Sequence, residues 1–158
     1  MFQSAFEIDL DISPEWCAWF SGWLDGEGCF TVESKGNRGN ALVPVLKVGL
    51  RDDDLLLLKQ VRHILNCGRV SSFSNESARI LGKQSQDTVR WQVKVISENC
   101  HIIVPILDKY PLRSKKHRDY IIWRELVMRV YQDEHLNSGR LRCLELVRQL
   151  SEVKKYKK

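Results

Sequence analysis

The segment from about residue 14 to residue 27 constrains the fold more than any other part of the chain, because its small and bulky side chains fall on different helical faces. A Ser-Pro pair at residues 13–14 is a typical helix start. Ala18, Gly22 and Gly26 recur every four residues and therefore form one stripe that is almost free of side chains. Each glycine costs about 1 kcal/mol of helix propensity. The stripe thus indicates that another helix backbone approaches closely.

The bulky residues of the same helix predict its other face. Trp16, Trp19, Phe20 and Trp23 are spaced i, i+3, i+4 and i+7, which is typical of a helix that buries one side. We expect these four side chains to enter the core of the domain. Taken alone, Gly22 is equally explained as a tolerated packing glycine.

The remaining sequence predicts alternating strands and helices. We expect strands at 29–35, 41–51, 69–73 and 88–96, a Gly/Asn-rich turn at 36–40, a polar loop at 74–87, and helices at about 52–65, 98–110, 115–131 and 140–153. Ser97 is the expected cap of the third helix, and Pro105 must kink that helix or mark its boundary. This order predicts one α+β domain over residues 1–158, with an αββαββα unit, a twisted antiparallel sheet and extra C-terminal helices at about 115–153. The first helix has no later repeat, and no linker interrupts the chain.

Composition narrows the class of protein. The chain carries 25 Lys and Arg against 20 Asp and Glu, a net charge of +5 that is compatible with a polyanionic partner. No apolar run approaches the roughly 18 residues of a membrane span, so we expect no membrane association. The five cysteines form no CxxC pair, which favours reduced structural thiols. The opening residues resemble no signal peptide, so we expect an intracellular protein that acts where it is made, in an organelle (chloroplast or mitochondrion) or a prokaryote.

Three ordered segments resemble one known family. FSGWLDGEG at residues 20–28 resembles the LAGLIDADG motif of homing endonucleases. VGLRDDDLLLLKQVRHILNCGRV at 48–70 resembles the family's second-strand, second-helix and third-strand block, and KYPLRSKKHRDYIIW at 109–123 resembles its later active-site segment. The likeness covers about residues 14–131 and, with one motif only, indicates the single-motif, homodimeric type.

The resemblance implies an Mg²⁺-dependent endonuclease that cuts double-stranded DNA at a long pseudo-palindromic site and leaves short 3′ overhangs. Two motif helices would pack through Ala18, Gly22 and Gly26, and Glu27 of each chain would ligate Mg²⁺ or a substituting divalent cation. Lys116, or less favourably Lys115, matches the family lysine near the scissile phosphate.

The resemblance is less informative about the roles of two neighbouring positions, Asp25 and Leu50. Asp25 belongs to the motif and is expected to brace helix ends rather than to bind metal. Leu50 stands where some relatives have a polar, water-ordering residue, so the resemblance leaves the proton acceptor open, with Arg51 as a possible substitute.

The sheet would read the DNA through its polar face in the major groove. The candidate DNA-binding residues are Thr31, Glu33, Lys35, Asn37, Arg38, Lys47, Arg69, Ser71, Arg90, Gln92 and Lys94. Val43 and Val45 could contact thymine methyl groups, and Phe73 is an unexpected apolar member of this face. A solvated sheet face would show the same alternation of polar and apolar residues.

Two other functions are compatible with the same fold. One is a group I intron maturase, with RNA as its partner. The other is a non-cleaving nucleic-acid-binding regulator. Retention of Glu27 and of the basic pair Lys115 and Lys116 favours cleavage, although cleavage and maturase activity can coexist in this family.

Overall fold

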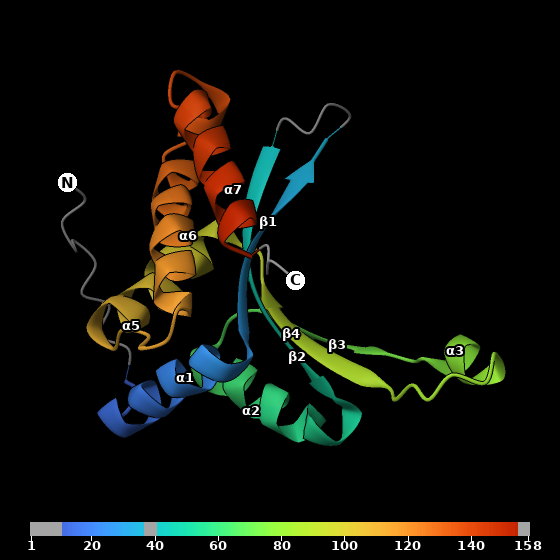
Figure 1. Cartoon of the computed structure of the whole chain (residues 1–158). Helices are drawn as coiled ribbons and strands as arrows, with labels where there is room; N and C mark the ends of the chain where they lie inside the picture. Colours follow the sequence, from blue (N-terminus) through green and yellow to red (C-terminus); the bar gives the residue numbers. More distant parts are fainter. Residues whose placement is uncertain (1–10, 37–40, 155–158) are drawn as a thin grey trace.

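The structure, a computed structural model, describes residues 11–36 and 41–154 (Figure 1). Its helices are α1 (Pro14–Glu27), α2 (Leu55–Leu65), α3 (Glu76–Ile80), α4 (Ile96–Glu98), α5 (Val104–Lys109), α6 (Lys116–Tyr131) and α7 (Arg140–Lys154). Its strands are β1 (Gly28–Lys35), β2 (Ala41–Arg51), β3 (Arg69–Phe73) and β4 (Thr88–Val93). Short 3-10 turns lie at η1 (Asp52–Asp54) and η3 (Glu134–Leu136), and a π-helical segment, η2, spans Asn99–Ile103. The predicted αββαββα order is therefore confirmed, with α3 as an addition.

The four strands form one antiparallel sheet in the order β1-β2-β4-β3. In Figure 1, α5, α6 and α7 lie along one side of this sheet and α1 and α2 lie below it. The opposite, concave side is not covered by a helix of the described residues. The sheet thus has one face packed on helices and one open face, as alternating strands require.

The core lies between the sheet and the helices. Phe20 of α1, Trp91 of β4 and Trp123 of α6 are fully buried there. A second, smaller cluster beside β2 joins α6 to α7 through Leu126 and Leu146. The helical face of the sheet is therefore filled from α1 to α7.

Helix α1 runs directly into β1 without a loop. Gly28 caps the helix with an extended backbone, and its N–H donates to the carbonyl oxygen of Leu24. A Cβ atom at Gly28 would lie 2.7 Å from that same oxygen. Because only glycine tolerates this approach, the sequence GEG fixes Glu27 at the junction of helix and sheet.

Two local predictions were wrong, and the prediction for Pro105 was confirmed. The polar loop at 74–87 contains α3. β4 ends at Val93 instead of residue 96, and α4 begins at Ile96, so Ser97 lies inside the helix and does not cap it. As predicted, Pro105 marks a boundary within the helix expected at 98–110. A π-helical segment ends at Ile103 and α5 begins at Val104, because proline has no N–H to donate and would clash inside a regular helix.

No helix of the described residues is both long enough and apolar enough to cross a membrane.

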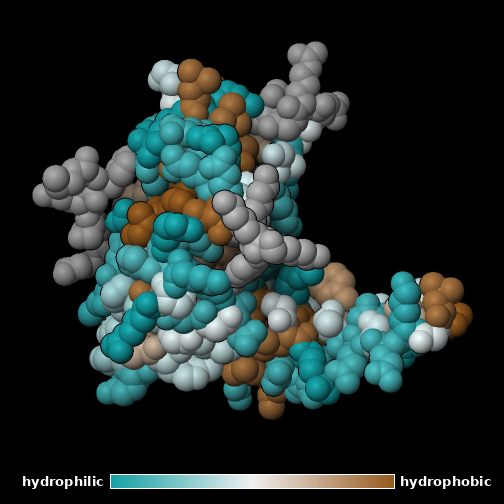
Figure 2. Space-filling view, in the orientation of Figure 1, coloured by the Kyte–Doolittle hydropathy of each residue, from teal (hydrophilic) through white to brown (hydrophobic). Residues whose placement is uncertain are grey.

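An extended arm, formed by the ends of β3 and β4 with α3, projects from the body at the right of Figure 1. Figure 2 shows an apolar tip on this arm, where Ile80 and Leu81 are the exposed large hydrophobic residues.

Candidate active site and nucleic-acid interface

The small stripe of α1 lies on the outside of the chain. Ala18, Gly22 and Gly26 are all exposed. A Cβ atom built on Gly22 or on Gly26 would meet nothing within 4 Å. The glycines are therefore not required by packing within the described residues, and the outer face of α1 has room for another helix backbone.

Trp19 contradicts the prediction that the whole bulky face is buried. Phe20 is fully buried, and Trp16 and Trp23 pack partly against the core, but Trp19 remains 42% exposed. Its ring stacks on Trp23, with centroids 5.6 Å apart and planes inclined by 11°. Trp19 precedes Gly22 by three residues, so the two positions are neighbours on the helix surface and Trp19 lies beside the stripe.

The end of α1 carries the predicted acid and meets the predicted lysine. Glu27 is exposed at the last position of the helix. The Nζ atom of Lys116 donates to the carbonyl oxygen of Gly26 at 2.5 Å and to that of Leu24 at 3.4 Å. The last turn of α1 has no basic residue of its own, so Lys116 supplies the positive charge that a helix C-terminus favours. Lys116, which lies 90 positions from Gly26 in the chain, thereby places an ammonium group at the end of the helix that carries Glu27.

Asp25 fixes the start of α6 against α1. Its carboxylate accepts hydrogen bonds from the backbone N–H of Arg113 at 2.7 Å, and from the N–H and hydroxyl of Ser114 at 3.1 and 2.7 Å. Burial alone would raise the pKa of Asp25, but these hydrogen bonds and the charge of Lys116 outweigh it and hold the pKa below its usual value. Asp25 therefore braces the segment that delivers Lys116, as expected from the sequence.

The other candidates near this junction lie as follows. Lys115 is exposed at the N-terminal cap of α6. Leu50 lies within β2 and packs partly against the core, so its side chain is on the helical side of the sheet. Arg51 pairs with Asp53 at 3.4 Å, outside the core.

The open face of the sheet gathers the predicted DNA-binding residues in rows. Cys29, Lys47, Gln92 and Arg69 are register partners across all four strands, and Gly49, Arg90 and Ser71 form the neighbouring row. Because side chains alternate along each strand, Thr31, Glu33 and Lys35 lie on this same face. The polar side of the sheet was thus predicted correctly. Asn37 and Arg38 lie outside the described residues.

Two of the candidate DNA-binding residues on this face pair with each other. Lys94, which directly follows β4, forms an ion pair with Glu33 of β1 at 2.7 Å. The pair crosses β2, which lies between those strands, on the side of Val45. Val45 is fully buried, so the predicted contact of Val45 with a thymine methyl group is wrong. The alternation of polar and apolar residues along β2 does not reveal an ion pair that residues of two other segments form across it.

The donor set suits a hard, hydrated cation better than a structural metal. The described residues hold no group of three or more His, Cys, Asp and Glu side chains that could hold a metal ion. Glu27 offers one exposed carboxylate. Mg²⁺ typically takes one or two carboxylates and fills its remaining positions with water and phosphate oxygens. One exposed carboxylate at the end of α1 fits that pattern, whereas zinc needs three or four protein ligands.

The sequence profile of the LAGLIDADG endonucleases matches residues 20–127. The chain belongs to this family. The match spans the C-terminal part of α1, all four strands and most of α6, which are the elements that form the junction and the open sheet.

Two fungal proteins have similar sequences. A 50.9 kDa protein in intron 1 of ND4 from Podospora anserina is 30% identical over 125 residues, which cover 75% of this chain and 25% of that protein. Probable intron-encoded endonuclease 2 of Neurospora crassa is 25% identical over 140 residues, or 87% of this chain and 28% of that protein. This LAGLIDADG chain spans about a quarter of the length of these curated relatives.

Solved structures have the same fold. The LAGLIDADG homing endonuclease I-GzeII in complex with its DNA target superposes with a TM-score of 0.73 and 18% identity, over 87% of this chain and 44% of that one. The homing endonuclease I-TnaI superposes with a TM-score of 0.68 and 24% identity, over 90% of this chain and 95% of that one.

Proposed function

We propose that two copies of this chain form a site-specific endonuclease that cuts double-stranded DNA at a long, pseudo-palindromic target. The observation that carries the proposal is the junction of α1 and α6, where the Lys116 ammonium group lies at the helix end that bears the exposed carboxylate of Glu27. A positive charge and a metal-ligating acid at one exposed helix end suit a scissile phosphate.

The bare stripe supports the proposed dimer. Gly22 and Gly26 leave open space on α1, and a second α1 related by a two-fold axis would fill it with the same residues. Glu27 lies directly after this stripe. Two-fold pairing would therefore bring the two carboxylates close to the axis, one for each DNA strand.

At each strand, the residues of this chain would have separate tasks. Glu27 would ligate Mg²⁺, which when bound activates water and stabilises charge at the phosphate. Lys116 would stabilise negative charge that develops on the phosphate oxygens, and Asp25 would keep Lys116 in place through the start of α6. Cleavage across the minor groove would leave short 3′ overhangs.

The open sheet would supply sequence recognition. Lys47, Gln92 and Arg69 in one row, and Arg90 in the next, present donors and acceptors of the kind that read base edges in the major groove. The relatives in fungal introns favour an intron-encoded protein that acts in an organelle. Group I intron maturation, with RNA as partner, is the second candidate.

The test is a selection from a randomised, pseudo-palindromic duplex library with Mg²⁺, with wild type and Glu27→Gln in parallel. We expect wild type to enrich one long, near-symmetric site and Glu27→Gln to cut nothing, while DNA affinity changes by less than about tenfold, or roughly 1.4 kcal/mol. If the folded, dimeric wild type cuts nothing, the endonuclease proposal fails. RNA binding and splicing assays would then test the maturase.

A further inference from the structure

Phe73 is an apolar residue on a sheet face that is otherwise mostly polar. It ends β3 and remains 41% exposed, so burial in the core does not explain it. The guanidinium carbon of Arg90 lies 4.8 Å from the centre of the Phe73 ring. Ser71 is the register partner of Arg90, and Phe73 stands two residues further along the same strand. The ring and the guanidinium group are therefore diagonal neighbours on the open face.

Three cations near these strands pair with carboxylates, whereas Arg90, within the part of the chain that the structure describes, does not. Lys94 is paired with Glu33, Arg51 with Asp53, and Arg79 with Asp87. Within residues 11–36 and 41–154, Arg90 forms no ion pair with a carboxylate, and the Phe73 ring is what it contacts. Its hydrogen-bond donors are thus not committed to an acid.

The surroundings of Arg90 leave space above the sheet. Its partner on β2 is Gly49, and a Cβ atom at Gly49 would meet nothing within 4 Å. Its partner on β3 is the short Ser71. The guanidinium group is therefore supported by one ring and bordered by two small residues.

We propose that Phe73 is a positioning residue that holds Arg90 to read one guanine in each half-site of the target. A stacked guanidinium group keeps its planar fork of donors free at the edges, and this fork matches the O6 and N7 acceptors of guanine. Contact with the ring restricts the flexible arginine before DNA arrives, so less conformational freedom is lost on binding. The inference rests on the proposed function, since it assumes that the open face meets DNA.

A direct role is the competing explanation for Phe73. An exposed aromatic ring in the major groove could itself contact a thymine methyl group. The two roles predict different losses when the ring is replaced. Support for Arg90 predicts weaker discrimination for guanine, and direct contact predicts weaker discrimination for thymine.

The experiment measures which sequences are enriched when the full chain binds a randomised pseudo-palindromic duplex library in EDTA, so that the result does not depend on cleavage. The variants are Arg90→Gln, Phe73→Leu and Phe73→Tyr. We expect Arg90→Gln to lower a guanine preference at one position per half-site by about tenfold or more. Phe73→Leu should lower the same preference by about two- to fivefold, and Phe73→Tyr, which keeps an aromatic face, should retain it.

Thr88→Ala is the matched control, because Thr88 is the exposed register partner of Phe73 and touches the same part of the sheet. It should leave the guanine preference unchanged. The inference is overturned if Phe73→Leu retains that preference, or if it loses a thymine preference instead. If wild type, shown to be folded, binds no DNA, the proposed function fails together with this inference. Binding with the guanine preference unaffected by Phe73→Leu defeats the inference alone.

Discussion

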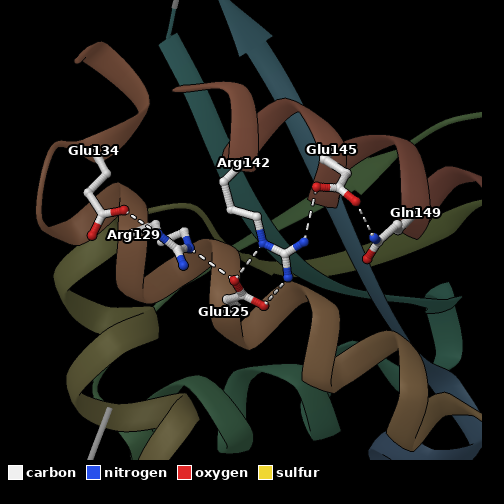
Figure 3. A network of polar contacts seen from close by, with 6 residues as sticks. All are labelled: Glu125, Arg129, Glu134, Arg142, Glu145 and Gln149. Atoms are coloured by element: carbon white, nitrogen blue, oxygen red, sulfur yellow. Dashed lines mark hydrogen bonds and ion pairs between the residues drawn. The ribbon is translucent and has the colours of Figure 1, made fainter. Parts of the chain in front are cut away.

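The outer face of α1 and the helical pair α6–α7 differ in how many of their contacts are made within a single chain. In the pair, Glu125 of α6 accepts hydrogen bonds from Arg142 of α7 at 2.9 Å and from Arg129 at 3.0 Å, and Arg142 also pairs with Glu145 (Figure 3). On α1, by contrast, the positions of Gly22 and Gly26 meet only open space. The polar groups between α6 and α7 are thus paired within the chain, whereas the outer face of α1 carries no side chains at Gly22 and Gly26.

This difference suggests that the α6–α7 contacts stabilise the single chain, whereas the outer face of α1 serves assembly. The α6–α7 network ties the C-terminal helices to one another over a small apolar cluster, so it contributes to the folding of a single chain. A bare glycine stripe contributes nothing to that folding and weakens the helix that carries it. Substitutions in the two regions should therefore affect different measurements.

The largest effect is expected from Gly22→Leu, which fills the bare face. Leucine favours a helix over glycine by about 1 kcal/mol, and its Cβ atom would have open space, so the folded monomer should be at least as stable as wild type. The dimer should dissociate, and cleavage should fall at least about a thousandfold, because the second carboxylate leaves the site. Sedimentation and melting of the same sample measure the two quantities separately.

Ser151→Leu is the control for this substitution, since it adds the same side chain at an exposed position of α7. It should leave both the sedimentation profile and cleavage unchanged. A Gly22→Leu chain that sediments as the wild-type dimer would contradict the proposed interface.

The sequence predicted regular elements well, because local patterns encode them. Alternation placed Lys47, Arg69 and Gln92 on one face, and the register confirms that they share a row. Four-residue spacing predicted that Ala18, Gly22 and Gly26 share one side of α1, and all three are exposed. Trp19 was wrongly assigned to the core, because hydrophobic periodicity does not distinguish a residue that faces the core from one that faces outward. An apolar residue on the edge of a bare face is consistent with a partner's approach.

Contacts between distant residues could not be predicted. The polar segment at 74–87 has no local pattern that predicts α3. This helix depends in part on Asp87, whose carboxylate accepts a hydrogen bond from the N–H of Asn75 at 2.9 Å and pairs with Arg79. The resemblance to the family selected Lys116, but not its bonds to the carbonyl oxygens at the end of α1. Such contacts arise from tertiary packing, for which local sequence carries no signal.

The next largest effect should come from Lys116→Met, which removes the ammonium group and keeps much of the side-chain length. Cleavage of bound DNA should fall by about ten- to a thousandfold, since an electrostatic contact near the phosphate is lost. Stability should fall by only about 1 kcal/mol, from the lost hydrogen bonds to the end of α1. Single-turnover cleavage and urea unfolding measure these separately.

Lys115→Met tests the neighbouring candidate at the cap of α6. It should reduce cleavage far less than Lys116→Met, because the hydrogen bonds to the carbonyl oxygens at the end of α1 come from Lys116. Equal losses for both variants, or a Lys116→Met enzyme that cuts at the wild-type rate once folded, would overturn the preference for Lys116.

A smaller, pH-dependent effect is expected from Asp25→Asn. The amide cannot accept all the hydrogen bonds that the carboxylate receives from Arg113 and Ser114, so unfolding free energy should fall by about 2 kcal/mol at pH 7. Because folding lowers the pKa of Asp25, its ionised form stabilises the protein above the unfolded value of about 3.9, and this contribution is lost as the pH falls through the lowered pKa. The difference between wild type and variant in urea unfolding should therefore shrink at low pH.

Asp54→Asn is the control, because Asp54 is exposed and its side chain makes no capping hydrogen bond at the start of α2. Its effect should stay below about 0.5 kcal/mol. A pH-independent loss in Asp25→Asn would show that the carboxylate charge does not hold the start of α6.

The smallest effect is expected in the α6–α7 pair, from Arg142→Ala. The hydrogen bonds from Arg142 lower the pKa of Glu125, but Glu125 keeps Arg129, and Arg142 is 40% exposed, so solvent screening limits the loss to about 1 kcal/mol. Since the folded pKa of Glu125 is the lower one, this loss should be complete at pH 7 and vanish as the pH falls through it.

Arg148→Ala is the control, since it removes a more exposed ion pair with Glu152 on the same helix and should lower the free energy of unfolding by less. Urea unfolding at fixed protein concentration measures both losses. Sedimentation and cleavage should remain as in wild type, and a dimer lost in Arg142→Ala would show that the α6–α7 pair also takes part in assembly.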